Sequence, residues 1–226
     1  MLAHWFKNIQ KTDFLRNIIT VLSGSTIAQV IPLVISPVLT RLYNPSDFGV
    51  LALYMSILSL LSVVVNGRYE LAIMLPKQRE DALNITAISL SITLIISTLS
   101  LFVFIGFNRF IAQSLNNETL ATWLPFLPLS VLLIGIYQTF TYYANRSKYF
   151  TFIALGSFNQ SVVTTGGKLS GGFTKCGAGG LIIATITGQV VATTVLCFQI
   201  IKKEWQKHSL SAVISRQKML AVAKKY

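Results

Sequence analysis

A chain of 226 residues with 53% hydrophobic and only 12% charged side chains is unlike a soluble domain, in which about 25% of residues are charged. Its several apolar runs are each near the roughly 20 residues that a helix needs to cross a bilayer, so the composition indicates an all-α integral membrane protein. The net charge of +12 does not indicate a nucleic-acid partner, because the sequence has no soluble basic groove interleaved with aromatic residues.

The first predicted span covers about residues 15–43 and follows a basic lead at residues 1–14. It contains Gln29, Pro32 and Pro37. A proline inside a membrane helix frees a backbone carbonyl that a neighbour or water must then satisfy. We therefore expect this helix to be kinked and to line a polar space.

The second predicted helix, at about residues 47–75, is the element around which the others are arranged. Its apolar run is interrupted near one end by Asn66-Gly67-Arg68-Tyr69-Glu70. A helix of this length would measure roughly 43 Å, against a hydrocarbon thickness of about 30 Å. We expect the end with Arg68 and Glu70 to stand in water, either as a solvated helix end or as a site where Arg68 meets an anionic headgroup and Glu70 binds a coupling cation.

Four further spans are predicted at about residues 82–107, 120–145, 149–173 and 179–201, with a polar loop at residues 108–119. The span at residues 149–173 is the least apolar and contains Lys168, the only charge inside a predicted span. Intramembrane charges are functional candidates, although a lysine near a helix end can also extend to the headgroups. Other polar residues accompany it in the same span: Asn159, Gln160, Ser161, Thr164 and Thr165. Glycines in this span and the next predict close helix packing.

Lysine and arginine residues are distributed unequally between the two sides that this order of spans defines. The side with both termini and with the loops after the second and fourth spans carries 15 of the 19, and the other side carries Arg41, Arg109 and Lys175. Positively charged loops stay in the cytoplasm. We therefore predict a bundle of six transmembrane helices over residues 15–203, with both termini cytoplasmic and a basic tail at residues 204–226.

Motifs for enzymatic chemistry are absent from the sequence. It has no P-loop, no Cys/His cluster and no His or carboxylate pair placed in a way that suggests a transferase or polymerase. We expect no enzyme activity, no metal and no cofactor.

Several short segments carry a family resemblance. They are Leu15-Arg16-Asn17, Gly24-Ser25-Thr26-Ile27-Ala28-Gln29, Pro37-Val38-Leu39-Thr40-Arg41-Leu42-Tyr43, Asp47-Phe48-Gly49, Gly67-Arg68-Tyr69-Glu70-Leu71-Ala72-Ile73, Gly180-Leu181-Ile182 and Gly188-Gln189. In combination they resemble the polysaccharide biosynthesis or O-antigen flippase (Wzx-type) family, within the multidrug/oligosaccharidyl-lipid/polysaccharide transporter superfamily. Such proteins have two helical bundles, so the resemblance implies that this chain is the N-terminal lobe and that a second, C-terminal lobe is missing.

The resemblance implies a flippase that moves undecaprenyl-pyrophosphate-linked oligosaccharide across the bacterial inner membrane, for O-antigen, capsule or exopolysaccharide assembly. A cationic cavity would meet the phosphates, with Arg68 and Lys168 supplying the charge. The residues expected to contact the sugar are Gln29, Gln138, Asn159 and Gln160. The expected partners are the lipid-linked oligosaccharide, the second lobe and a glycan polymerase complex.

Three alternatives remain open at this stage. A drug/cation antiporter of the same superfamily would favour a buried acid in the lobe, and a membrane glycosyltransferase or polymerase would need larger outer loops with paired carboxylates. A non-transporting membrane component of a glycan assembly complex would share the same composition.

Overall fold

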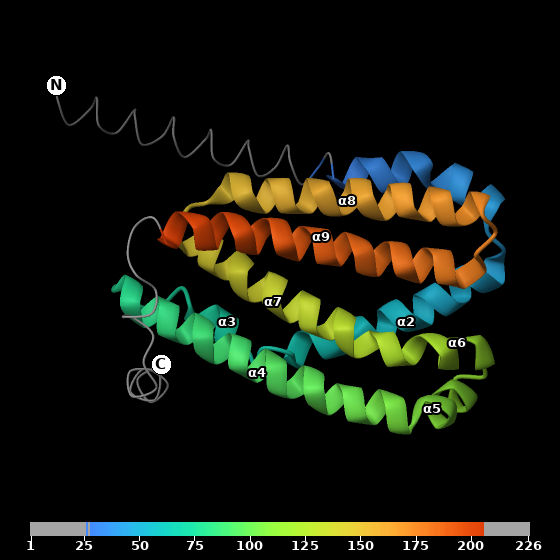
Figure 1. Ribbon diagram of the computed structural model, residues 1–226, viewed down its shortest axis with the longest axis horizontal. Helices are drawn as coiled ribbons and strands as arrows, with labels where there is room; N and C mark the ends of the chain where they lie inside the picture. The colour runs from blue at the N-terminus through green and yellow to red at the C-terminus, as the bar shows by residue number, and fades with distance from the viewer. Residues whose placement is uncertain (1–25, 27, 206–226) are drawn as a thin grey trace.

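The computed structural model describes residue 26 and residues 28–205, so the predicted lead and almost all of the predicted basic tail lie outside the described part. The described residues form helices joined by short turns, which confirms the all-α class for this part of the chain. The long helices run side by side along the longest axis of the molecule, and the turns between them gather at its two ends (Figure 1).

The helices follow one another back and forth between these two ends. Their bounds are Ala28–Leu42 for the first helix as described, then α2 Pro45–Val64, α3 Tyr69–Ala72, α4 Arg79–Gly106, α5 Asn108–Ser114, α6 Glu118–Trp123, η1 Leu124–Phe126, α7 Leu127–Arg146, α8 Phe150–Phe173 and α9 Gly177–Trp205. We call the end formed by residues 65–78, 146–149 and 202–205 the basic end, because most of the lysines and arginines of the described part lie there. The turns before α2, around α5 and between α8 and α9 form the opposite end.

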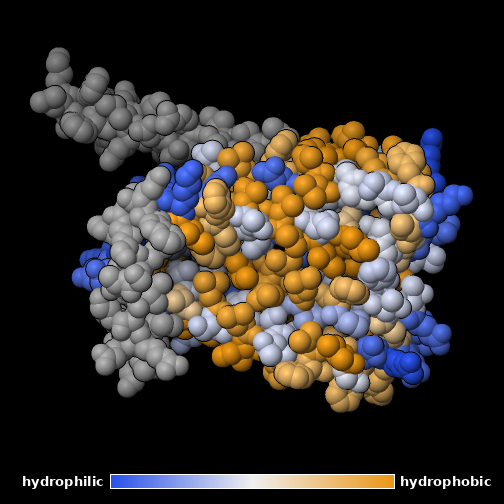
Figure 2. Space-filling view, in the orientation of Figure 1, coloured by the Kyte–Doolittle hydropathy of each residue, from blue (hydrophilic) through white to orange (hydrophobic). Residues whose placement is uncertain are grey.

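Four stretches of the described chain are long and apolar enough to cross a membrane. They are Pro45–Val64, Arg79–Gly106, Glu118–Arg146 and Gly177–Glu204. The helix α8 is not among them, and the first helix is described over a shorter apolar stretch, so this criterion supports four of the six predicted spans. Hydrophobic side chains cover much of the middle of the visible face, and the most hydrophilic ones gather toward the ends (Figure 2), as expected of a multi-pass membrane protein.

The predicted continuous helix over residues 47–75 is wrong. The helix α2 ends at Val64, and a separate single turn, α3, begins at Tyr69. Between them Gly67 and Arg68 have φ angles of +57° and +64°, which a right-handed helix does not contain.

Tertiary hydrogen bonds hold this break in place. The buried Asn66 donates its amide to Oε1 of Gln138 in α7 at 3.1 Å, and its side-chain oxygen accepts a hydrogen bond from Thr93 in α4. Arg146 at the end of α7 donates to the carbonyls of Pro76 and Gln78, at 2.7 and 3.1 Å. The segment after α2 is thus fixed by partners from two other helices.

The predicted polar loop at residues 108–119 is largely helical. The helix α5 occupies Asn108–Ser114, and Asn117 caps α6 by accepting a hydrogen bond from the backbone N–H of Leu120 at 3.1 Å. Asparagine is among the preferred residues at such a position because its short side chain satisfies a free N–H of the first turn.

The helices α8 and α9 approach each other closely along glycines, as the sequence predicts. A Cβ atom built on Gly171 would lie 2.8 Å from Cα of Gly180, and one built on Gly167 would lie 2.8 Å from Cβ of Ala184. Small residues allow two membrane helices to bring their backbones together in this way.

Candidate functional site: a polar groove beside α8

A groove lined by several polar residues, which we call the polar groove, lies between the first helix and α8. Its volume is about 330 Å³, and its lining residues are Ala28, Gln29 and Pro32 from the first helix and Ser157, Gln160, Ser161 and Thr164 from α8. Ligand sites in proteins commonly measure about 300–1,000 Å³, so the groove has the size of a small binding site.

The polar residues of α8 meet the groove because of their spacing. Positions 157, 160, 161 and 164 are three or four residues apart, which places them on one face of a helix. Lys168 follows Thr164 by four residues, so it extends this row of polar side chains, the polar stripe of α8, toward the opposite end. Its side chain is half-buried there. The stripe therefore joins neutral hydrogen-bonding groups to one cation.

Pro32 explains how the first helix is joined to this stripe. Because proline has no N–H, the carbonyl of Ala28, four residues earlier, lacks its helical partner. The buried hydroxyl of Ser161 donates to that carbonyl. A carbonyl freed by proline is expected to need a neighbouring donor, and α8 supplies it here. This contact fixes one wall of the groove.

Gln160 lines two spaces at once. On its other side is a cavity of about 20 Å³ formed with Tyr137, Gln189 and Thr193. Such a volume holds about one water molecule. Oε1 of Gln189 is buried and has no hydrogen-bond partner within residues 28–205. The polar surface therefore continues from the groove into the contact between α7, α8 and α9.

Tyr43 joins the end of the first helix to the part of α8 that carries Lys168. Its hydroxyl donates to the backbone carbonyl of Lys168 at 2.6 Å. Burial raises the pKa of Tyr43, and the nearby Cys176 and Asp47 act in the same direction. The phenol is therefore protonated at neutral pH and can donate this bond.

The four residues predicted to contact the sugar do not lie together in the structure. Gln29 and Gln160 line the groove together. Asn159 lies on the other face of α8, and its amide donates to the carbonyl of Leu155 at 2.8 Å. Gln138 accepts the hydrogen bond from Asn66 at the break after α2.

The structure does not bring Arg68 and Lys168 together. The 20 residues of α2 begin close to Tyr43 and extend about 30 Å before Arg68 is reached. Arg68 is exposed at the basic end, in keeping with a solvated segment. Glu70 is only 5% exposed, and its Oε2 has no hydrogen-bond partner in the described part of the chain. The expectation that both charges stand in water therefore fails for Glu70.

Sequence reasoning missed Ser157 and the contact between Ser161 and Ala28. The spacing of small polar residues along α8 was the available signal for Ser157. The partner of the Ala28 carbonyl had no signal of its own, because 133 residues separate it from Ser161.

The apolar helices and the polar groove define a multi-pass, helical membrane protein with a candidate binding surface. The profile of a family described as polysaccharide biosynthesis protein matches residues 38–220, most of the chain. The protein belongs to this family. No match was found among curated proteins or among solved structures.

Proposed function

We propose that the protein moves a lipid-linked oligosaccharide across the bacterial inner membrane, as one lobe of a two-lobe transporter. The polar groove beside α8 is the observation that supports this function most directly. It places hydrogen-bonding side chains on one side of a bundle that has four stretches apolar enough to cross the membrane. The family match supports a role in polysaccharide biosynthesis.

The chemistry of the groove suits a glycan. Each sugar hydroxyl donates and accepts hydrogen bonds, and the amides of Gln29 and Gln160 can do both. In an apolar layer these groups would replace the water that the sugar loses, since unpaired polar groups there cost several kcal/mol each. Lys168, further along the same face, would pair with a phosphate of the lipid carrier.

The groove also supports a second lobe. Gln29 is exposed, and polar side chains turned toward lipid are costly, so we propose that another helical lobe faces the first helix and α8 across the groove. The substrate would then lie between two bundles. Glu70 is a separate candidate for ion coupling, just beyond the end of α2, and that helix extends about 30 Å from its start near Tyr43.

The test is an export assay in cells that lack their own flippase, with the variants made in the full-length protein. Gln160→Leu removes an amide from the groove at nearly constant volume, and we expect at least a tenfold loss of exported glycan. Lys168→Ala should also reduce export, and Lys168→Arg should retain more because the charge is kept. Asn159→Leu is the matched control, because it is the neighbouring residue on the other face of α8.

Equal export by Gln160→Leu, Lys168→Ala and Asn159→Leu, at equal protein levels in the membrane, would overturn the proposal. If glycan assembly still required the protein in that case, a non-transporting role in a glycan assembly complex would be favoured instead.

A further inference from the structure

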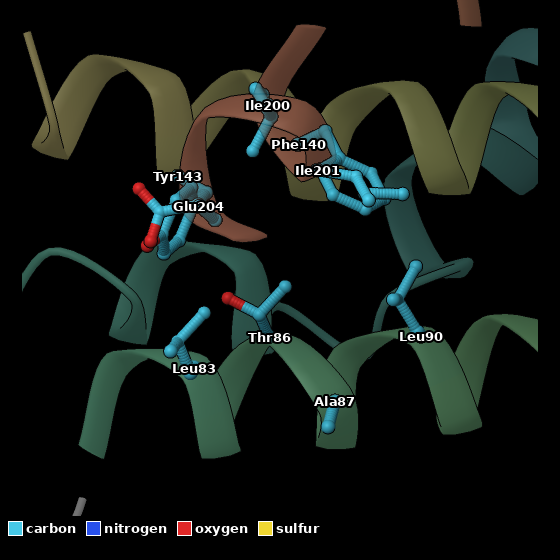
Figure 3. Close-up of a pocket in the computed structure, with 9 residues that line it drawn as sticks. All are labelled: Leu83, Thr86, Ala87, Leu90, Phe140, Tyr143, Ile200, Ile201 and Glu204. Carbon is cyan, nitrogen blue, oxygen red and sulfur yellow. The ribbon is translucent and has the colours of Figure 1, made fainter. Parts of the chain in front are cut away.

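A second hollow, the apolar groove, lies between α4, α7 and α9. Its apolar wall is formed by Leu83, Ala87, Leu90, Phe140, Ile200 and Ile201. In Figure 3 these side chains, from α4 on one side and from α7 and α9 on the other, border one common space. Its volume of about 150 Å³ is below the range for drug-sized ligands, so it suits part of a single hydrocarbon chain better than a sugar.

One end of the apolar groove is polar. Glu204 of α9 lines it there and forms an ion pair with Arg79, the first residue of α4. Tyr149 donates its hydroxyl to the other carboxylate oxygen of Glu204 at 3.2 Å. The groove therefore begins at the basic end beside a charged cluster and continues between apolar helices, which is the pattern of an amphiphile.

One donor in this cluster remains unused by the described residues. Nε of Arg79 is buried without a hydrogen-bond partner there, whereas the hydroxyl of Tyr143, which lines the groove, interacts with the side chains of Arg79 and Glu204. A buried donor without a partner is unfavourable. A ligand oxygen beside Arg79 and Tyr143 would satisfy this donor.

The charges near the polar end favour an anionic headgroup. The loop before α4 carries Lys77, and the last turns of α9 carry Lys202 and Lys203. Lys203 lies 4.4 Å from the ring centre of Tyr149 and 5.2 Å from that of Phe152. The acids of this region are Glu204, which is paired with Arg79, Glu80 and Asp81, which have interactions of their own, and Glu70, which is buried in α3. The lysines and arginines of the region outnumber them.

We propose that the apolar groove binds one acyl chain of an anionic membrane phospholipid, whose phosphate is held by Arg79 and Tyr143. The lipid would connect the start of α4 with the ends of α7 and α9. This site is separate from the polar groove beside α8 and does not depend on the transport function. If the basic end lies in the cytoplasm, as the charge distribution predicts, the lipid belongs to the inner leaflet.

The experiment uses the whole protein in nanodiscs that contain a trace of phosphatidylglycerol or phosphatidylcholine with a photoreactive group on the acyl chain. Labelled peptides are then identified by mass spectrometry. We expect phosphatidylglycerol to label residues 83–90 and 200–201 at least fivefold more than phosphatidylcholine. Arg79→Gln should reduce labelling to the phosphatidylcholine level, and Arg79→Lys should keep part of the difference.

Leu90→Trp gives a test that leaves the ion pair intact. The larger ring should fill the apolar groove and abolish labelling at residues 200–201. Leu94→Trp, one turn further along α4 where the side chain is 56% exposed, is the matched control and should label as the unmodified protein does.

Three results would overturn the proposal. Equal labelling by the two lipids would make the apolar groove an ordinary lipid-facing surface. Displacement of phosphatidylglycerol by a small excess of undecaprenyl phosphate would assign the site to the lipid carrier. Crosslinks from position 87 to residues 206–226, retained when lipid is added, would assign the groove to the C-terminal segment of the chain.

Discussion

The contact between α8 and α9 differs in kind from the contact between α4 and α7. The first is made through glycines, and Gly171 and Gly180 bring the two backbones together. The second is made through hydroxyl groups: Ser89 and Thr139 lie 2.8 Å apart, and Ser97 donates to the carbonyl of Pro128 at 2.9 Å.

This difference explains why a polar groove forms beside α8. Because glycines make much of the contact between α8 and α9, polar side chains of α8 can also border the groove beside the first helix. Thr164 and Gln160 reach both sides, since Thr164 also lies against Gly188 and Gln160 also lines the cavity beside Gln189. In α4 the buried residues Ser89 and Ser97 are hydrogen-bonded to α7, and its exposed surface is mostly apolar. Polar residues on a membrane helix thus mark a binding surface only where packing does not need them.

The largest expected effect comes from a side chain placed between α8 and α9. Gly171→Leu would force atoms against Cα of Gly180, which is backbone and can move only with the whole helix. We expect a loss of about 3 kcal/mol or more in the free energy of unfolding, measured by denaturant titration in detergent micelles. Gly166→Leu is the control, because a Cβ there has nothing within 4 Å. Equal stability of the two variants would show that glycine packing is not what holds α8.

A smaller effect is expected from the polar contacts around the break. Asn66→Leu would leave Thr93 and Gln138 without their shared partner. We expect a loss of about 1–2 kcal/mol, since hydrogen bonds between membrane helices contribute modestly. Asn159→Leu, whose amide bonds only within its own helix, should cost less than about 0.5 kcal/mol in the same titration. A cost for Asn66→Leu as small as for the control would contradict the assigned role.

The smallest effect is expected at the single bond between Tyr43 and α8. Tyr43→Phe should lower the free energy of unfolding by about 1 kcal/mol, because it removes the donor to the Lys168 carbonyl. Burial raises the pKa of Tyr43 above 10.0, so the difference between the two proteins should be constant up to about pH 10 and shrink as pH rises through the folded-state pKa. A difference that changes between pH 6 and 9 would point to another group.

Apolar runs predicted most helices well, because turn residues mark the two ends of each run. The predicted range 149–173 differs from α8 by one residue at its start, and 179–201 lies within α9. The break after α2 was missed because hydropathy does not register backbone conformation. Asn66 holds the break through hydrogen bonds with Thr93 and Gln138, 27 and 72 positions away, which the local sequence does not contain.

The candidate site was foreseen only in part for a similar reason. The polarity of residues 149–173 and the prolines of the first helix indicated a polar space, and Gln29 and Gln160 line it. Whether a polar residue is free depends on its partner in three dimensions. The sequence alone groups Gln138 with the other sugar-contacting residues, because its bond to Asn66 cannot be read from composition. The apolar groove was missed because Arg79 and Glu204 are 125 residues apart.

The contact of Arg146 with the loop before α4 has a consequence for biogenesis. Arg146 comes 70 residues after Pro76, whose carbonyl it holds. A ribosome that delivers the chain from its N-terminus has therefore made all of α4 to α7 before this loop receives its partner. Until then water must satisfy the carbonyls of residues 76–78, which keeps the loop at the membrane surface while the following helices insert. The bonds that hold residues 76–78 can thus form only after α7 has been made.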